Sequence, residues 1–545
     1  MASMSFLQKE RAHYIPHVPP LLEILPSLVA SPDETLVVHD SDIIKELFPN
    51  TSKYPFLSFQ RGSKPTATPM KVGVVLSGGQ ASGGHNAISG LFDGLKKIHP
   101  GSTLIGFLEG PGGIIKNKSI VITEKLLESY RNQGGFDIIG SGRTKIETPE
   151  QFLAAEETVV SLGLNGLVII GGDDSNSNAA FLAEYFKKQG VPVDVIGVPK
   201  TIDGDLRSEH IEISFGFDTA CKVYSEIIGN TLKDSLSQKK YYFFVKLMGR
   251  SASHITLECA LMTHPNLALI GEEIAAKNQT LKDVVQQIVD LVVKRAEQGK
   301  NYGAILIPEG IIEFIPDVNR MLKEINEIVA KGPSSLETAI GQAPVAVSRF
   351  NAEMLSKPSQ ETFNIFPEDI QKQLLFDRDP HGNVQVSKIE SERFLMDLVV
   401  KELDTQEIKG RYKGKFSGQP LFCGYEGRSA MPSNFDANYC YSLGCTAAVL
   451  LNNHVSGYIA CVKNLSKPVH EWTIMGIPIH TMLYQEKRGG KEVTVIKKAL
   501  VDLNSKYFKE FASQRELWAM DDDYLCPGPI QFYGPTTDTP PLTIC

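Results

Sequence analysis

The chain has 545 residues, 42% of them hydrophobic and 22% charged, which is enough to bury more than one core in roughly three domains or fewer. Its formal net charge of -8 argues against a protein that binds nucleic acid or an anionic membrane, because the basic surface of such a protein normally shows in the total. An anionic substrate would therefore need a local basic pocket.

The cysteines and the N-terminus predict a cytoplasmic protein. The eight cysteines are scattered, and no two of them form a Cys-x-x-Cys pair. The chain does not start with a cationic segment followed by an apolar signal core, so we expect reduced thiols rather than disulfides. No apolar run reaches the length that crosses a membrane.

Residues 1–70 are rich in proline and lack a sustained period, which predicts an extension that packs on the body of the protein. From Lys71 onward, strand and helix signals alternate, which predicts a βαβ series and an open parallel sheet with helices on both faces. The expected strands are 72–76, 103–107, 167–170 and 193–198, and the expected helices are 86–98, 150–162 and 178–189.

A second unit of this kind is predicted to begin near Ile213. It has an expected helix over 224–232 and expected strands over 241–247 and 303–307. Between about 311 and 415 the sequence is charged and helix-prone, with breaks at Gly332-Pro333 and Gly414, which indicates an inserted helical region. We therefore predict two similar lobes with a cleft between them.

Two polar segments follow strands of the first unit. One is Gly171-Gly172-Asp173-Asp174-Ser175, and the other is Pro199-Lys200-Thr201-Ile202-Asp203-Gly204-Asp205. Ligands bind where the strands of a parallel sheet end. Glycines allow a close approach to phosphate, and clustered carboxylates can hold Mg²⁺ or take a proton from a hydroxyl. The pair predicts phosphoryl transfer.

Each of these segments also has a simpler explanation. Asp173 and Asp174 could cap a helix, but one cap suffices and adjacent carboxylates repel each other without a cation, which favours a phosphate-linked Mg²⁺ role for Asp173. Asp203 and Asp205 could belong to a surface turn. In an extended segment they project to one side, and Lys200 beside them would keep Asp203 ionised as a proton acceptor.

Other loops add candidates for binding phosphate or sugar. The loop Leu76-Ser77-Gly78-Gly79-Gln80-Ala81-Ser82-Gly83-Gly84-His85-Asn86 can cradle a phosphate or be a plain strand-to-helix turn. Three segments that follow the second lobe's strands or the insertion carry groups that grip a sugar phosphate, although each group could also belong to a surface salt bridge. They are Met248-Gly249-Arg250, Pro308-Glu309-Gly310 and Tyr425-Glu426-Gly427-Arg428.

The ordered set of motifs resembles the phosphofructokinase family, and most closely its long pyrophosphate-dependent 6-phosphofructokinases, including the catalytic beta chain of the plant enzyme. The match runs from Lys71 to the C-terminal region. The resemblance implies two Rossmann-like lobes with mostly parallel sheets, an N-terminal extension and a helical insertion. It divides the chain into 1–70 (extension), 71–212 with about 430–485 (phosphate-donor lobe), 213–310 with about 486–545 (sugar-phosphate lobe) and about 311–415 (insertion).

The resemblance also implies a role for each candidate residue. Asp203 matches the general base, with Lys200, Thr201 and Asp205 as further catalytic residues and Asp173 as the magnesium-associated carboxylate. Pyrophosphate would bind at Gly79, Arg143, Asp174 and Lys200. Fructose 6-phosphate would bind at Thr201, Ile202, Asp203, Met248, Gly249, Arg250, Glu309, Tyr425 and Arg428, with Lys240 and Tyr241 supplied across a homodimer interface.

The residues at two positions predict which phosphate donor the protein uses. Relatives that use ATP carry Gly where this chain has Asp174, and again where it has Lys200. A carboxylate at 174 repels the α-phosphate of ATP, and Lys200 adds a charge that stabilises the transferred group. The expected reaction is reversible, Mg²⁺-dependent transfer from pyrophosphate to the C1 hydroxyl of fructose 6-phosphate. An ATP-dependent kinase and a non-catalytic regulatory subunit of the family remain the alternatives.

Overall fold

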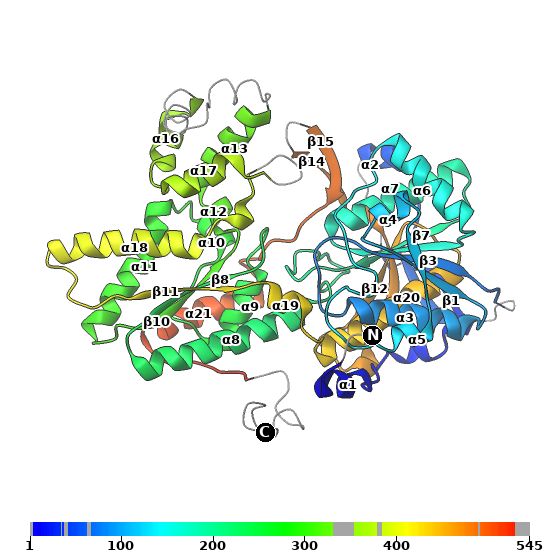
Figure 1. The fold of residues 1–545 in the computed structure, drawn as a ribbon, viewed down its shortest axis with the longest axis horizontal. Coiled ribbons are helices and arrows are strands. Elements are labelled where there is room, and N and C mark those ends of the chain that lie inside the picture. Colours follow the sequence, from blue (N-terminus) through cyan, green and yellow to red (C-terminus); the bar gives the residue numbers. More distant parts are fainter. Residues whose placement is uncertain are drawn as a thin grey trace.

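The chain forms two α/β lobes, each built around one sheet, with a helical insertion beside the smaller sheet (Figure 1). The structure is a computed structural model, and it describes residues 4–33, 35–36, 42–62, 67–330, 354–378, 384–488 and 491–528. The predicted break at Gly332-Pro333 lies outside these residues. The predicted fold class, α/β with mostly parallel sheets, is confirmed.

The larger sheet has its parallel strands at its centre. Antiparallel strands extend it on both sides. In spatial order the strands are β1 (Leu28–Pro32), β2 (Leu57–Arg61), β13 (Thr473–Pro478), β12 (Tyr458–Lys463), β7 (Asp194–Pro199), β6 (Gly166–Gly171), β3 (Lys71–Leu76), β4 (Thr103–Phe107) and β5 (Ser119–Ile122).

The N-terminal segment is more deeply integrated than the sequence indicated. It contributes β1 and β2 to the edge of the larger sheet, where β2 pairs with β13 from the far end of the chain. The Arg11 guanidinium also donates hydrogen bonds to Asn434 Oδ1 and to the carbonyl of Pro432. The described part of residues 1–70 therefore completes the sheet as well as packs on it.

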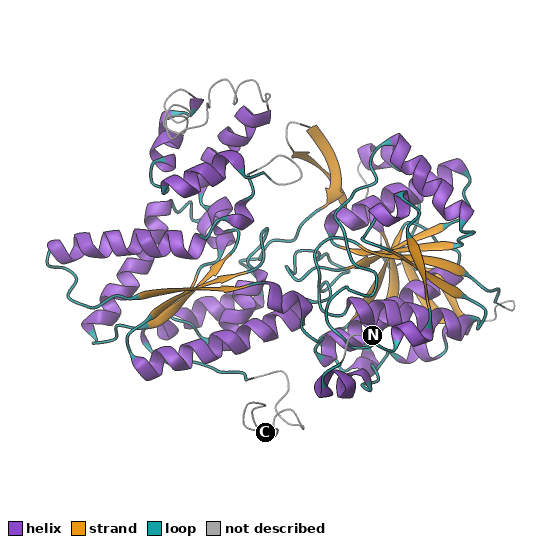
Figure 2. Cartoon of the chain, viewed as in Figure 1, coloured by secondary structure: helices purple, strands orange, loops and turns teal. Residues whose placement is uncertain are grey.

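Helices cover both faces of this sheet, as Figure 2 shows. Alternate side chains of β3 point to opposite faces: Val72 and Val74 belong to one buried cluster, and Val75 belongs to another. The first cluster includes side chains of α3 (Gly84–Ile98) and α20 (Asn434–Asn452), and the second includes side chains of α6 (Pro149–Ser161) and α7 (Asp173–Gln189). Burial on both faces accounts for the nearly continuous apolar runs of these strands.

Helices α3 and α20 pack so closely that their backbones are in contact. A Cβ added to Gly90 would lie 2.0 Å from the carbonyl oxygen of Tyr441, and one added to Gly444 would lie 2.1 Å from that of Ala87. The other α-helices of this lobe are α1 (Phe6–Ala12), α2 (Asp42–Leu47), α4 (Gly112–Ile115) and α5 (Glu124–Leu127). The chain also has 3₁₀ helices at Pro20–Glu23, Leu25–Ser27, Val386–Lys388, Val469–Glu471 and Ile479–Met482.

The smaller sheet is parallel throughout its described strands. Their spatial order is β11 (Gly418–Cys423), β8 (Tyr242–Leu247), β10 (Gly303–Pro308) and β9 (Leu267–Ala268). The helices of this lobe are α8 (Phe217–Gln238), α9 (His254–Thr263), α10 (Gly271–Ala276), α11 (Leu281–Glu297), α18 (Ser391–Ile408), α19 (Tyr425–Ser429) and α21 (Lys506–Met520). One buried cluster extends from the larger sheet through α20 and α8 to Val245 of β8, so the two lobes share a core.

The insertion contains α12 (Ile311–Phe314), α13 (Pro316–Ala330), α16 (Lys357–Phe363) and α17 (Glu368–Phe376). A ribbon of β14 (Leu483–Arg488) and β15 (Lys491–Ile496) lies against α7 of the large-sheet lobe, and α21 then packs on the small-sheet lobe. The chain therefore changes lobes at about 497–501, later than the predicted boundary at about 486. Strand β11 belongs to the smaller sheet and lies in the stretch that the predicted division left unassigned.

Candidate active site

A cleft of about 1930 Å³ lies between the two lobes and the insertion. Its position follows from the larger sheet, where β4 and β6 lie on opposite sides of β3, so the order in which successive strands are added to the sheet reverses there. The loops that follow the carboxyl ends of strands at such a reversal leave a crevice in which ligands bind. The loops after β3, β6 and β7 all line this cleft.

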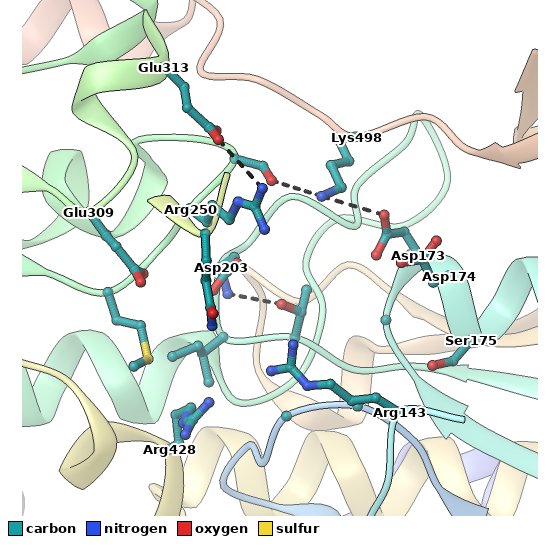
Figure 3. A pocket seen from close by; sticks show the side chains of 18 of the residues that line it. Arg143, Asp173, Asp174, Ser175, Asp203, Arg250, Glu309, Glu313, Arg428 and Lys498 are labelled. Carbon is teal, nitrogen blue, oxygen red and sulfur yellow. Dashed lines mark hydrogen bonds and ion pairs between the residues drawn. The ribbon is translucent and has the colours of Figure 1, made fainter. Parts of the chain in front are cut away.

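The structure brings most of the predicted residues into this one cleft. Those that line it are Gly79, Arg143, Asp173, Asp174, Lys200, Thr201, Ile202, Asp203, Met248, Arg250, Glu309, Tyr425 and Arg428. Figure 3 shows side chains from both lobes facing the same space. Asp205, Gly249, Lys240 and Tyr241 are not among the lining residues.

Cations surround the glycine loop after β3. Gly78 has a φ of +86°, and an added Cβ would lie 3.1 Å from Lys200 Nζ. A Cβ on Gly79 would lie 3.2 Å from Arg428 Nη1 and 3.8 Å from Arg143 Nη2. The absence of side chains thus lets three cations approach the loop backbone, which is an arrangement suited to an anion such as phosphate.

Lys200 is buried at the end of β7. Its amide donates to the carbonyl of Gly171 at 2.9 Å, so its backbone is bonded to the last residue of β6. Burial lowers the pKa of its ammonium to about 8, against the opposing effect of Asp203 and Asp173. At neutral pH this side chain still carries most of its charge, so it can neutralise a phosphate.

Asp173 and Asp174 occupy the first turn of α7, which begins five residues before the predicted start at 178. The N-cap is Gly172, so neither aspartate is the cap. Asp174 Oδ1 lies 3.1 Å from Lys145 Nζ, and Asp173 Oδ2 lies 3.7 Å from Lys498 Nζ. That Asp173 oxygen is buried and has no hydrogen-bond partner among the described residues, so it is suited to receive a cation that enters with a ligand.

Asp203 and Asp205 differ in position. Gly204 between them has a φ of +69°, so the segment turns instead of running extended, and the prediction that both carboxylates project to one side is wrong. Asp203 lines the cleft, and its amide is 3.2 Å from Thr201 Oγ1, whereas Asp205 is buried behind it. Burial raises the pKa of Asp203, against the effects of Lys498 and Lys200.

The buried Asp205 has its pKa raised to about 7, by desolvation and then by Asp203. The Asp203 charge therefore opposes ionisation of the carboxylate behind it. Because only Asp203 lines the cleft, it is the one placed to take a proton from a ligand.

Side chains at the strand ends of the smaller sheet form the opposite wall. The amide of Gly249, a residue with a φ of +122°, donates to Glu309 Oε2 at 3.1 Å and so orients that carboxylate. Burial, followed by the Asp203 charge, raises the Glu309 pKa to about 7. Arg250 lies 3.5 Å from Glu313, and the Arg428 guanidinium lies 4.9 Å from the centre of the Tyr425 ring.

Lys240 and Tyr241 do not reach the cleft of their own chain. They precede β8, at the end of that strand opposite Met248, and the Lys240 side chain is exposed. Its ammonium lies 4.8 Å from the centre of the Tyr241 ring. If these residues bind substrate, they do so in another copy of the chain.

Lys145 and Lys498 were missed in the sequence. Lys145 follows Arg143 closely and could have been noticed as another cation of the same loop. Lys498 had no local signal, because its partners Ser251 and Asp173 are distant in the chain. Burial lowers its pKa, but Asp173, Asp205 and Asp203 together raise it above the ordinary lysine value.

Comparison with known proteins identifies the family. Residues 71–358, more than half of the chain, match the family model described as Phosphofructokinase. The chain belongs to the phosphofructokinase family. The predicted resemblance is thus confirmed, and the glycine loop, Asp173 and Asp203 all fall within the matched residues.

Similarity to individual phosphofructokinases extends over almost the whole chain. The chain is 48% identical over 556 residues to the pyrophosphate–fructose 6-phosphate 1-phosphotransferase of Treponema pallidum, covering 99% of this chain and 97% of the relative. It is 52% identical over 528 residues to the beta subunit of that enzyme from Solanum tuberosum, covering 96% and 91%.

A solved phosphofructokinase supports the fold alone. It is the pyrophosphate-dependent phosphofructokinase from Nitrosospira multiformis, with a TM-score of 0.53, 15% identity, and coverage of 84% of this chain and 93% of that chain.

Every helix in the described ranges is too short or too polar to cross a membrane.

Proposed function

We propose that the chain transfers a phosphoryl group from pyrophosphate to the C1 hydroxyl of fructose 6-phosphate, reversibly and as a step of glycolysis. The observation that carries this proposal is the placement in one cleft of three cations around a glycine loop, Asp203 beyond them and Glu309 on the facing wall. The names of relatives that are 48% and 52% identical over nearly the whole chain support it.

In the proposed step, Asp203 accepts the proton of the C1 hydroxyl. The hydroxyl oxygen forms a bond to one phosphorus of pyrophosphate, and the bond from that phosphorus to the bridging oxygen breaks, so that orthophosphate leaves. Lys200, Arg143 and Arg428 would neutralise the phosphate oxygens, since phosphoryl transfer depends mainly on positioning and charge. Glu309, held by the Gly249 amide, would accept a hydrogen bond from the sugar.

We propose that Mg²⁺ enters as part of the pyrophosphate substrate. Within the described ranges, the side chains of His, Cys, Asp and Glu form no group of three or more arranged to hold a metal ion. The buried Asp173 oxygen, which lacks a hydrogen-bond partner in this part of the chain, would supply one ligand, and phosphate oxygens would supply others. When bound, the ion would offset the negative charge of the donor.

A comparison of donors tests the proposed reaction. With fructose 6-phosphate and equal Mg²⁺, we expect kcat/KM to be at least about 100-fold higher for pyrophosphate than for ATP, because Asp174 repels the α-phosphate of a nucleotide. Formation of fructose 1,6-bisphosphate, which is the product with either donor, would be followed in a coupled assay, with a chelator reaction as the control for Mg²⁺ dependence.

Other results of the donor comparison would overturn the proposed reaction. Faster turnover with ATP would favour the ATP-dependent alternative. Binding of fructose 6-phosphate by the purified chain, with no turnover from either donor, would favour a regulatory subunit.

We also propose a homodimer whose active sites each receive Lys240 and Tyr241 from the other subunit. Lys240 is exposed and Tyr241 is partly exposed, and both lie at the end of β8 away from their own cleft, which supports this. A cytoplasmic location is proposed as well, since the seven described cysteines are free thiols and a reducing compartment suits them.

Co-expression of two inactive variants tests the shared site. Asp203→Asn and Lys240→Glu should each be nearly inactive alone. In a heterodimer, one of the two sites would combine both intact residues. Random pairing makes about half of the dimers heterodimers, so co-expression should restore about a quarter of wild-type activity. Sedimentation would verify the dimer mass, and Lys239→Glu is the matched control for charge reversal. A failure of the co-expressed pair to exceed either variant would exclude the shared site.

A further inference from the structure

Residues 497–501, the crossover segment, carry the chain from the ribbon to the small-sheet lobe. Hydrogen bonds from both lobes hold this segment. The Ala499 amide donates to the carbonyl of Asp205 at 2.7 Å, and the Ala499 carbonyl lies 2.9 Å from His254 Nε2. The Val501 amide donates to the buried Glu272 carboxylate at 3.0 Å. The backbone that follows Lys498 is therefore held between the two lobes.

The Lys498 side chain extends from this segment into the cleft (Figure 3). Its ammonium donates to Ser251 Oγ of the small-sheet lobe at 2.8 Å and lies 3.7 Å from Asp173 Oδ2 of the large-sheet lobe. The Lys498 side chain is 35% exposed, so a ligand in the cleft can reach it. At 3.7 Å the contact with Asp173 is an ion pair without a hydrogen bond, so no directional bond holds the ammonium to that carboxylate.

Asp203 interacts favourably with two lysines that come from different parts of the chain, Lys498 on the crossover segment and Lys200 at the end of β7. A phosphoryl group moving to a hydroxyl that Asp203 deprotonates must come next to that carboxylate. Both ammonium groups are then close to the negative charge that the transferred group carries. Lys200, Arg143 and Arg428 surround the glycine loop, whereas Lys498 approaches from beside Ser251.

We infer that Lys498 is a further catalytic residue, which binds the oxygens of the transferred phosphoryl group from the side opposite the glycine loop. When the donor and its Mg²⁺ engage Asp173, the ammonium exchanges that carboxylate for phosphate. It keeps its proton throughout, so the bonds formed and broken are those of the reaction proposed above. The inference rests on that proposed function.

Two variants at this position test the inference by kinetics. Lys498→Met should lower kcat by about 10²- to 10³-fold and leave the KM for fructose 6-phosphate within about threefold, because it removes a charge that acts on the transferred group. Lys498→Arg should have a kcat at least about tenfold higher than that of Lys498→Met, since a guanidinium also binds phosphate. Lys506→Met, at the exposed start of α21, is the control for loss of a lysine charge.

A binding measurement separates this inference from the proposed reaction. By calorimetry with Mg²⁺, the wild type should bind pyrophosphate at least about tenfold more tightly than Lys498→Met, while both bind fructose 6-phosphate equally. Equal kcat and equal pyrophosphate affinity in wild type and Lys498→Met would overturn the inference. A wild type that binds pyrophosphate but gives no turnover would overturn the proposed reaction instead, and the affinities would still decide the role of Lys498.

Discussion

Asp203→Asn is expected to lower kcat by about 10²- to 10⁴-fold, because the substitution removes the proton acceptor of the proposed reaction and leaves the shape of the side chain almost unchanged. Asp203 is the aspartate of its segment that lines the cleft, beside Lys200 and Lys498. The measurement is steady-state turnover with saturating pyrophosphate, together with calorimetric binding of fructose 6-phosphate. Binding should change by less than about threefold, since a general base acts mainly after the substrate is bound.

The pH profile provides a second readout of the same substitution. Burial raises the Asp203 pKa, so wild-type activity should fall as the pH drops through that raised value and the carboxylate becomes protonated. It should also fall as the pH rises above about 8, where Lys200 loses its proton. The acid limb should be absent in Asp203→Asn, and the alkaline limb should remain.

Asp205→Asn is the matched comparison, because this buried residue lies behind Asp203 and does not line the cleft. We expect it to lower kcat less than Asp203→Asn does. If both substitutions weaken sugar binding and leave kcat intact, the assignment of Asp203 as the base is wrong.

The loops of the candidate site were predictable because they follow strands with a clear pattern. The apolar run before Gly171 and the one before Lys200 form adjacent parallel strands, β6 and β7, and so the polar residues after them had to meet at one edge of the sheet. The same reasoning placed Met248 and Glu309 on one wall, since β8 and β10 are also adjacent and parallel.

Other features depend on contacts that no local pattern encodes. Strand β2 joins the larger sheet by pairing with β13, more than 400 residues along the chain, and its flanking segment is rich in proline. Lys498 reaches Ser251 across 247 positions. The turn at Gly204 was missed because two aspartates separated by one residue were treated as an extended segment. The β2 pairing and the Lys498 contact depend on tertiary structure, and the turn depends on the left-handed backbone conformation of Gly204.

The choice of donor should depend on two side chains that lie in different environments of the same cleft. The Asp174 carboxylate is partly exposed and paired with Lys145, whereas Lys200 is buried next to Gly78. Asp174 would therefore act by excluding a nucleotide, and Lys200 by stabilising the transferred group. The two contributions should be separable by substitution, because removing repulsion admits ATP, whereas removing a cation weakens every donor.

The double variant Asp174→Gly with Lys200→Gly is expected to lower kcat/KM for pyrophosphate by about 10²- to 10³-fold and to give measurable turnover with ATP. Asp174→Asn with Lys200 intact is the control that removes the negative charge and keeps the side-chain volume. If repulsion is the cause, this control should admit ATP while pyrophosphate turnover falls less than in the double variant. Thermal unfolding should accompany the kinetics, because a glycine in place of a residue at a strand end costs about 1 kcal/mol. An unchanged donor preference in a folded double variant would mean that residues 174 and 200 do not select the donor, and that the selection lies elsewhere in the cleft.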